Sequence, residues 1–360
     1  MDITAELAGM KLKSPLLPAS GPLTGTAEKL IELSRFPLGA LVTKTISVEK
    51  PDIPRQFIQG YGNFIMNCEP WSEYSADVWK KEFLPVVKRK AAQPLFISLG
   101  YSADDMKHLV PLMNGFADGY EISTHYTGKD LSPVEETVRT VRGLTDKPVY
   151  MKVSPHFPDP VAFAEAVMEN GGNGIVAVNS LGPSMKIDLP SRSVAIGNKE
   201  GQAWMSGPAI KPVALAFVNN IRRHVPGCEI IGVGGVETAE DVLEFLLAGA
   251  DAVEMLSAAL LKGRGLYQKI IDDLPGVLEK YHFSSVREVV ETDLKISSTA
   301  YGNGKPVFDA ERCVKCGICQ NICPFFAIEK TDICMNVNPD KCLGCGLCIT
   351  RCPKNAVSRT

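Results

Sequence analysis

Eight cysteines near the C-terminus form two runs with one spacing, C-x2-C-x2-C-x3-C-P. The two runs consist of Cys313, Cys316, Cys319 and Cys323, and of Cys342, Cys345, Cys348 and Cys352. Nine of the eleven cysteines in the chain lie between positions 313 and 352. Thiols that cluster in this way, instead of spreading through the sequence, indicate a metal site rather than a disulfide framework.

This spacing is typical of segments that wrap two cubane iron–sulfur clusters, where the fourth cysteine of each run binds the other cluster. We therefore expect one [4Fe–4S] cluster on Cys313, Cys316, Cys319 and Cys352. We expect the second cluster on Cys342, Cys345, Cys348 and Cys323. A pair of zinc sites is the alternative, but zinc usually takes two C-x2-C pairs separated by a long gap. Cys334 lies outside both runs, and we interpret it as a packed thiol.

The segment before the cysteines is long enough for one large domain. The chain has 360 residues, of which 45% are hydrophobic, so a core of normal size is available. A net charge of -3 does not indicate a nucleic-acid or membrane-surface binder. No apolar run approaches the roughly 18 residues that span a bilayer, and the first residues lack the apolar core of a signal peptide. We expect a cytoplasmic protein.

Short apolar runs alternate with amphipathic stretches over most of the chain. The runs, which are typical of buried parallel strands, lie at 15–20, 40–45, 94–100, 119–123, 148–154, 174–180, 229–235 and 252–258. Ser132, Asp159 and Thr238 are expected to be N-caps of three helices between them. The alternation predicts a (β/α)8 TIM barrel over residues 1–300 and a small α+β domain, like a bacterial ferredoxin, over residues 301–360. An open doubly wound sheet is the alternative, but no G-x-G-x-x-G turn follows the first strand.

Polar residues gather at the ends of the predicted strands, where the chemistry of such a barrel takes place. Lys44 and Lys152 each close an apolar strand, and two lysines at one rim favour a functional role over two solvated strand ends. Gly234 and Gly235 precede a helix start, and Ser257 follows the eighth strand. Bare amides at a helix N-terminus bind phosphate, so we expect FMN here, with a phosphate-bearing substrate as the alternative.

The barrel region resembles class 1 dihydroorotate dehydrogenases and the flavin domain of dihydropyrimidine dehydrogenases. The motifs that carry the resemblance run in the family order from residue 15 to 260 and include PASGPL, LVTKTIS, NFIMN, PVYMKVSP, GIVAVNSLGPSMKID and IIGVGGVETAEDV. The C-terminal segment resembles two-cluster ferredoxins over residues 308–357. The resemblance implies FMN contacts at Ala19, Ser20, Lys44, Thr45, Lys152, Asn179, Ser180, Gly207, Gly234, Gly235 and Ser257.

The same resemblance implies roles for individual side chains. Lys152 is expected beside the electron-rich edge of the flavin ring, where an ammonium stabilises reduced, anionic flavin. Asn67, Asn179 and Ser180 are expected to bind amide and carbonyl groups of the substrate. Ser123 occupies the position of an asparagine in the family and joins this substrate-binding set.

The loop after the fourth strand departs from the family. Members carry an asparagine followed by Ser-Cys-Pro-Asn or a variant, with a cysteine or serine that exchanges a proton with substrate, whereas this chain reads YEISTHYTGKDLSP. Tyr126 falls near the acid/base position, and we predict it as the general acid/base, with His125 as second choice and Lys44 in the catalytic set. The alternative is that Tyr126 only packs over the flavin and binds substrate. Cys68 is a third candidate donor, although a buried, inert thiol is the simpler interpretation.

Together these features predict an FMN and iron–sulfur oxidoreductase that reduces or forms a C=C bond conjugated to a carbonyl. Electrons are expected to come from a ferredoxin or from a separate NAD(P)H-oxidising flavoprotein subunit, because no second nucleotide-binding motif is present. A dihydroorotate or dihydropyrimidine dehydrogenase with an altered loop is one alternative, and a non-catalytic electron-transfer subunit is another. An aldolase-type barrel would need no iron–sulfur cluster. We also expect a homodimer, as is common in the family.

Overall fold

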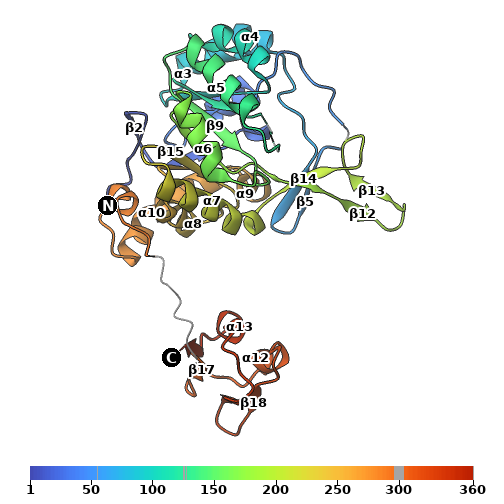
Figure 1. Ribbon diagram of the computed structural model, residues 1–360, viewed down its shortest axis with the longest axis vertical. Coiled ribbons are helices and arrows are strands. Elements are labelled where there is room, and N and C mark those ends of the chain that lie inside the picture. The colour runs from blue at the N-terminus through green and yellow to red at the C-terminus, as the bar shows by residue number, and fades with distance from the viewer. Residues whose placement is uncertain (55, 125, 127, 296–303, 360) are drawn as a thin grey trace. The chain divides into compact units, whose positions relative to one another are not determined.

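The computed structural model describes residues 1–54, 56–124, 126, 128–295 and 304–359. The chain separates into two units, Met1–Leu294 and Lys295–Thr360 (Figure 1). The first unit contains a large parallel sheet, and the second contains the two cysteine runs. Among the described helices, none combines the length and the apolar character that crossing a membrane requires.

Eight parallel strands form the main sheet of the first unit. In spatial order they are β3 (Leu16–Pro18), β16 (Ala252–Met255), β15 (Glu229–Val233), β10 (Gly174–Ala177), β9 (Val149–Val153), β8 (Gly119–Ile122), β7 (Leu95–Leu99) and β4 (Leu41–Val42). The Gly39 N–H donates to the Leu16 carbonyl (3.0 Å), which brings the start of β4 against β3 and nearly closes the sheet. The barrel is therefore confirmed, and each of the eight predicted runs contains one of its strands.

Helices alternate with these strands and cover the outside of the barrel (Figure 1). The longer ones are α1 (Ala27–Leu33), α3 (Leu84–Lys90), α4 (Ala103–Met113), α5 (Ser132–Leu144), α6 (Pro160–Glu169), α7 (Lys211–His224), α8 (Ala239–Ala248) and α10 (Gly265–Lys280). Shorter pieces are α2 (Ala76–Val78), α9 (Ser257–Lys262) and α11 (Val286–Val290). Apolar residues on one face of each long helix bury against the strands, which is why the amphipathic period predicts their positions.

Two of the three predicted N-caps are confirmed and one is wrong. The Asp159 side chain accepts hydrogen bonds from the first turn of α6, and Thr238 accepts one from the Asp241 N–H of α8 (3.2 Å). Ser132 is instead the first helical residue of α5. The Asp130 carboxylate accepts from its N–H (3.0 Å) and from its hydroxyl (2.6 Å), since a charged acceptor two residues earlier competes for these donors.

Side chains alternate along the barrel strands, so one set packs under the helices and the other fills the barrel. The interior set includes Phe96, Tyr150 and Ile231. Leu7 and Leu12 join the same cluster from the hairpin β1 (Ala5–Leu7) and β2 (Met10–Leu12). Because apolar side chains occupy this layer, the interior is a packed core at this level, and the pocket described below lies at the C-terminal ends of the strands.

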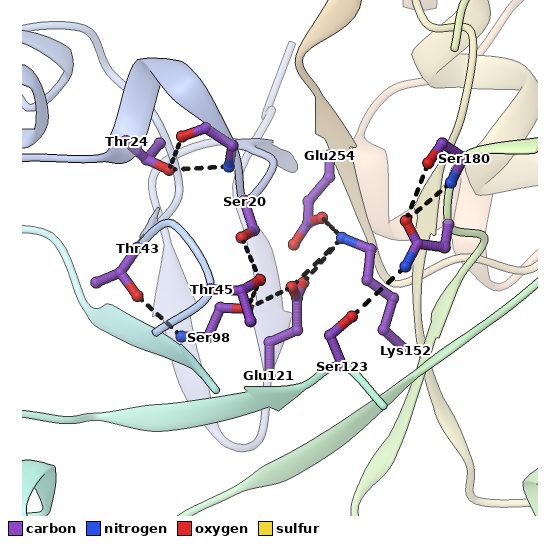
Figure 2. Close-up of polar contacts among 12 residues, drawn as sticks. Ser20, Thr24, Thr43, Thr45, Ser98, Glu121, Ser123, Lys152, Ser180 and Glu254 are labelled. Carbon is purple, nitrogen blue, oxygen red and sulfur yellow. Dashed lines mark hydrogen bonds and ion pairs between the residues drawn. The ribbon is translucent and has the colours of Figure 1, made fainter. Parts of the chain in front are cut away.

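Further along the strands, towards their C-terminal ends, the barrel interior becomes polar. Glu121 on β8, Lys152 on β9 and Glu254 on β16 are exposed by 2%, 8% and 1% of their side chains. The Lys152 Nζ lies 3.3 Å from Glu121 Oε1 and 3.5 Å from Glu254 Oε2 (Figure 2). We call these three residues the buried ion triad.

Two carboxyl groups and one ammonium cannot balance their charges if all three ionise. Burial, followed by the charge of Glu121, raises the pKa of Glu254 well above its ordinary value, and Lys152 offsets only part of this effect. Burial alone would lower the pKa of Lys152, but the two carboxylates outweigh it and raise that pKa. The triad is therefore best described as one ammonium, one carboxylate and one protonated carboxyl.

A smaller antiparallel sheet stands beyond the barrel strands. Its order is β11 (Leu181–Ser184), β14 (Ala203–Ser206), β6 (Phe64–Asn67) and β5 (Ile58–Tyr61), and the hairpin β12 (Lys186–Asp188) and β13 (Ser193–Ile196) projects beside it (Figure 1). The predicted elements do not include this sheet. The two residues Gly62 and Asn63 link β5 to β6, and a Gly-Asn pair between strand-like runs is the hairpin signal in the sequence.

The second unit is a small α+β domain, as predicted. Strand β17 (Pro306–Phe308) pairs with β20 (Val357–Arg359), and β18 (Ile328–Lys330) pairs with β19 (Met335–Val337). Each cysteine run carries one short helix, α12 (Ile318–Asn321) or α13 (Leu347–Thr350). The small core of this unit includes thiols of both runs. The stability of a unit this small therefore depends on the group that those thiols bind.

Glu254→Gln is expected to weaken the pH dependence of stability. Folding raises the Glu254 pKa, so the folded chain keeps a proton that the unfolded chain releases above about pH 4.3, and the free energy of unfolding falls as pH rises towards the folded pKa. Glutamine keeps the shape and never ionises. The stability advantage of the variant over wild type should therefore grow with pH when urea unfolding is followed by tryptophan fluorescence.

Glu82→Gln is the matched control, because Glu82 is an exposed carboxylate outside the triad. Its difference in stability from wild type should stay constant with pH. A Glu254→Gln difference that is equally constant from pH 5 to pH 8 would contradict the proposed protonation of Glu254.

Candidate functional site

A pocket lies where the barrel strands end, and it encloses about 1010 Å³ with the solvent at its mouth included. This volume is at the upper end of the range for sites that hold small ligands and cofactors, about 300–1,000 Å³. The predicted binding residues that line it are Ala19, Ser20, Lys44, Thr45, Asn67, Ser123, Lys152, Asn179, Ser180, Gly234, Gly235 and Ser257. The carboxyl ends of seven of the parallel strands bring together all of these residues except Asn67, which comes from β6 (Phe64–Asn67) of a separate antiparallel sheet, and the set spans 238 positions of the sequence.

Gly207 is the one predicted FMN contact that the structure does not place in the lining of this pocket. It has a φ of +149°, and a Cβ there would lie 2.7 Å from the Cβ of Phe64 on β6. The close approach of two backbone segments therefore explains glycine at this position. Its neighbour Ser206 does line the pocket.

Tyr126 also lies away from the lining of the pocket. It borders a separate hollow with Tyr101 and Thr124, and its ring centroid is 6.3 Å from that of Phe157. His125 lies outside the described residues. The acid/base assignment of these two residues stays a prediction.

Cys68, the third candidate proton donor, is buried beneath the antiparallel sheet and does not line the pocket. Burial raises the pKa of its thiol. A thiol that resists ionisation in this way is a poor nucleophile and a poor acid, which agrees with its interpretation as a packing residue.

A chain of hydroxyl groups leads from the rim of the pocket to the buried ion triad (Figure 2). Ser20 Oγ lies 2.9 Å from Thr45 Oγ1, which lies 2.9 Å from Ser98 Oγ. Ser98 in turn donates to Glu121 Oε1 (2.9 Å). Each hydroxyl has one proton, so Ser98 accepts from Thr45 and Thr45 accepts from Ser20. All three donors are thereby aligned towards Glu121, which also contacts Lys152.

Lys44, the second lysine in the pocket lining, is paired with two carboxyl groups of its own. Its Nζ lies 2.6 Å from Glu69 Oε1 and 2.8 Å from Glu73 Oε1, and the side chains of Lys44 and Glu69 are only 3% and 8% exposed. Burial raises the pKa of Glu69 in spite of the nearby Lys44. For Glu73, burial is the largest single influence, but Lys44 outweighs it and lowers the pKa.

The four carboxylates around these two lysines are absent from the predicted site residues. Glu121 and Glu254 stand as single charges inside the apolar runs GYEIS and AVEMLSA, and an acidic residue in a buried strand is a signal for a paired charge. Glu69 and Glu73 lie in an irregular loop, where no periodicity indicates which side chains point inward.

The glycine-rich end of the pocket fits a phosphate group. Gly234 and Gly235 have φ values of +130° and +75°, and a Cβ at Gly235 would lie 2.8 Å from the Gly207 carbonyl oxygen. Only glycine tolerates this conformation and this contact, and it leaves bare amides along the pocket wall. The hydroxyl-bearing Ser257 lines the same pocket.

The cysteines of the second unit border two cavities, and each cavity takes three cysteines from one run and one from the other. The first is lined by Cys313, Cys316, Cys319 and Cys352. The second is lined by Cys342, Cys345, Cys348 and Cys323. These are the groups that the spacing predicts for two clusters, although the ligand assignment itself stays a prediction.

The geometry of these thiols also bears on the zinc alternative. Nowhere in the described part of the chain do three or more His, Cys, Asp or Glu side chains converge as a single metal ion requires. A cubane binds each thiolate through a different iron, so its ligands surround a volume instead of meeting at a point.

Gly317 and Gly346, with φ of +80° and +81°, turn each run into its short helix. Cys334 lies outside both cavities.

Comparison with known proteins identifies both units. The model of the family described as dihydroorotate dehydrogenase matches residues 2–278, and that of the 4Fe-4S dicluster domain matches residues 312–356. Relatives named dihydroorotate dehydrogenase B (NAD(+)), catalytic subunit, include one from Oceanobacillus iheyensis, 31% identical over 81% of this chain and 98% of the relative. Those from Pyrococcus furiosus and Bacillus pumilus are 31% and 32% identical, over 82% and 83% of this chain and 100% and 99% of the relatives.

These matches confirm the resemblance in the barrel motifs and the predicted class of enzyme, an oxidoreductase that acts on CH–CH bonds. The match to the dicluster domain agrees with the repeated cysteine spacing. The chain thus belongs to the dihydroorotate dehydrogenase family and carries a C-terminal 4Fe-4S dicluster domain.

Proposed function

We propose that this protein is an FMN- and iron–sulfur-dependent oxidoreductase that reduces a C=C bond conjugated to a carbonyl in a small, cyclic substrate. The observation that carries the proposal is the combination, in one chain of this family, of two four-cysteine cavities with a barrel pocket that has a glycine-lined end and a buried lysine. The two [4Fe–4S] clusters are assigned to the cysteine sets described above.

In this proposal the pocket holds FMN by two features. Gly234, Gly235 and Ser257 would bind its phosphate, and Lys152 would contact its ring. FMN, when bound, supplies both two-electron hydride chemistry and one-electron exchange, while a [4Fe–4S] cluster exchanges single electrons. The fixed ammonium of Lys152 favours negative charge on a neighbouring ligand, because the triad holds it in place before the ligand binds.

The substrate gains two electrons and two protons in this reaction. Hydride adds to one carbon of the double bond, and a side chain delivers a proton to the neighbouring carbon. Tyr126 is the proposed donor, with His125 as second choice. Asn67, Asn179 and Ser180, with Ser123 beside them, would bind the amide and carbonyl groups that orient the ring.

The electrons would come from outside the chain. A ferredoxin or an NAD(P)H-oxidising flavoprotein subunit is the proposed donor, and the relatives support this because they are named as catalytic subunits of an NAD(+) enzyme. Low-potential donors of this kind favour reduction of the substrate over its oxidation. The same relatives support a second candidate function, oxidation of dihydroorotate itself.

Anaerobic titration of the reduced, intact protein tests the proposal. Cyclic enones, uracil, thymine and orotate are added in turn, and recovery of the oxidised flavin absorbance identifies a compound that accepts electrons. At least one uncharged ring should reoxidise the flavin. If none does while a saturated analogue reduces the flavin, the direction is reversed. Protein that contains neither flavin nor iron after anaerobic reconstitution would refute the proposal.

Paired cysteine substitutions test the crosswise ligand assignment. Wild type should contain about eight iron atoms per chain, and Cys352→Ser combined with Cys313→Ser should remove about four, because both thiols serve one cluster. Cys352→Ser combined with Cys342→Ser should remove about eight. Iron and sulfide analysis measures the content, and Cys334→Ser is the control that should lose none. If the Cys352/Cys313 double variant lost more iron than the Cys352/Cys342 double variant, the crosswise assignment would be contradicted.

Tyr126→Phe tests the proton donor. Turnover should fall by about 100-fold or more, the usual contribution of a general acid, while flavin content stays unchanged. Tyr101→Phe removes a hydroxyl from the same hollow and should leave turnover near that of wild type. Full turnover of Tyr126→Phe with normal flavin content would rule out this assignment and leave His125 as the candidate.

A further inference from the structure

The pocket has no cation left to bind an anionic substrate. Among the described residues that line it, the cationic side chains are Lys44 and Lys152. Each is within 3.5 Å of two carboxylates, Glu69 and Glu73 for Lys44, and the other members of the buried ion triad for Lys152. Four carboxyl groups therefore surround two ammonium groups, so each lysine of the lining already has acidic partners within the protein.

Glu69 presents an acceptor to this pocket. Its Oε1 accepts from Lys44, while within the described residues no hydrogen bond reaches its Oε2. The side chain is 8% exposed and belongs to the pocket lining, so a ligand in the pocket would meet it in a largely dry environment. The Lys44 ammonium at 2.6 Å favours the carboxylate form of Glu69, although burial acts against it, and in that form Oε2 accepts a hydrogen bond from a donor on the ligand.

The loop that carries Glu69 is fixed in place. The Ser72 N–H donates to the Thr45 carbonyl (2.8 Å), and the Trp79 indole N–H donates to the Ser72 hydroxyl (2.7 Å). Ser72 and Trp79 are both fully buried. Because these contacts tie the loop to the segment after β4 that carries Lys44 and Thr45, Glu69 cannot move away from an incoming anion without breaking them.

We infer that Glu69, held by Lys44, selects an uncharged ring that offers an N–H or O–H donor, such as a cyclic amide or ureide, and rejects rings that carry a carboxylate. This inference rests on the proposed function, since it names the substrate class of the same pocket. It separates this chain from an enzyme that acts on dihydroorotate, whose ring carries a carboxylate that would lie beside Glu69 and would find both lysines of the lining already paired.

Matched pairs of ligands test the inference in the flavin-loaded, full-length protein. Each pair shares a ring with N–H donors and differs by one carboxylate: uracil and orotate, and dihydrouracil and dihydroorotate. Binding is read from the change in the flavin absorbance spectrum without turnover. The uncharged member of at least one pair should bind about 100-fold more tightly than its carboxylate.

Glu69→Gln supplies the second measurement, because it keeps the size of the side chain and removes its charge. It should raise the affinity of the carboxylates by about tenfold or more and narrow the ratio within each pair. Glu82→Gln, an exposed carboxylate outside the pocket, should leave the ratio unchanged. If Glu69→Gln does not fold, the affinity ratios measured within each ligand pair for the wild-type protein are sufficient to test the inference.

The outcomes separate this inference from the proposed function. A carboxylate that binds wild type more tightly than its uncharged partner overturns the inference, and reoxidation of the flavin by that same carboxylate leaves the proposed reaction intact. Equal ratios in wild type and Glu69→Gln also overturn it. If no ring of either kind changes the spectrum or reoxidises the flavin, both the proposed function and the inference are wrong.

Discussion

The placement of Lys152 between two carboxyl groups inside the barrel is the constraint on which the site depends. A charge in a packed interior costs several kcal/mol unless it is paired, and here one ammonium must serve Glu121 and Glu254 together. A shared proton resolves this imbalance. The consequence is a cation that cannot move and that faces the one hollow end of the barrel, so the polar layer positions a charge for a ligand before any ligand arrives.

The rest of the pocket is arranged around this fixed point. Hydroxyl groups from Ser20 to Ser98 extend the hydrogen bonding of Glu121 to the rim, and the bare amides of Gly234 and Gly235 provide a separate anion site. The two ends therefore differ in chemistry: one suits a phosphate, and the other is crowded with carboxylates. This asymmetry suits a cofactor with an anionic tail whose reactive ring meets an uncharged substrate.

Resemblance to relatives accounts for the scaffold of the pocket and not for its chemistry. The strand that precedes Lys44 and the strand that carries Lys152 occupy the positions that the family motifs predict, yet the loop after β8 lacks a cysteine, and the acidic side chain of Glu69 lines the pocket. Fold and cofactor site are shared across a superfamily, whereas selectivity depends on the few side chains that meet the reacting ring.

The sequence by itself determined the barrel, the cysteine runs and the small residues of the phosphate end. Each of these follows from local rules: continuous apolar runs for parallel strands, fixed spacing for thiolates, and glycine where the backbone needs a positive φ. Local rules failed at Ser132, a predicted N-cap. Its N–H and its hydroxyl both donate to the Asp130 carboxylate, and Ser132 is the first residue of the helix instead.

Only the tertiary structure decided which charges meet. Glu121 and Glu254 are 133 positions apart. Glu121 meets Lys152 from the neighbouring strand β8, whereas Glu254 reaches it from β16, which is separated from β9 by two strands, because both side chains point into the barrel interior. Glu69 meets Lys44 through a loop whose path follows from buried contacts of Ser72 and Trp79. Periodicity predicts which face of a strand is buried, but it carries no information about partners across a closed sheet, and those partners set the charge of the pocket.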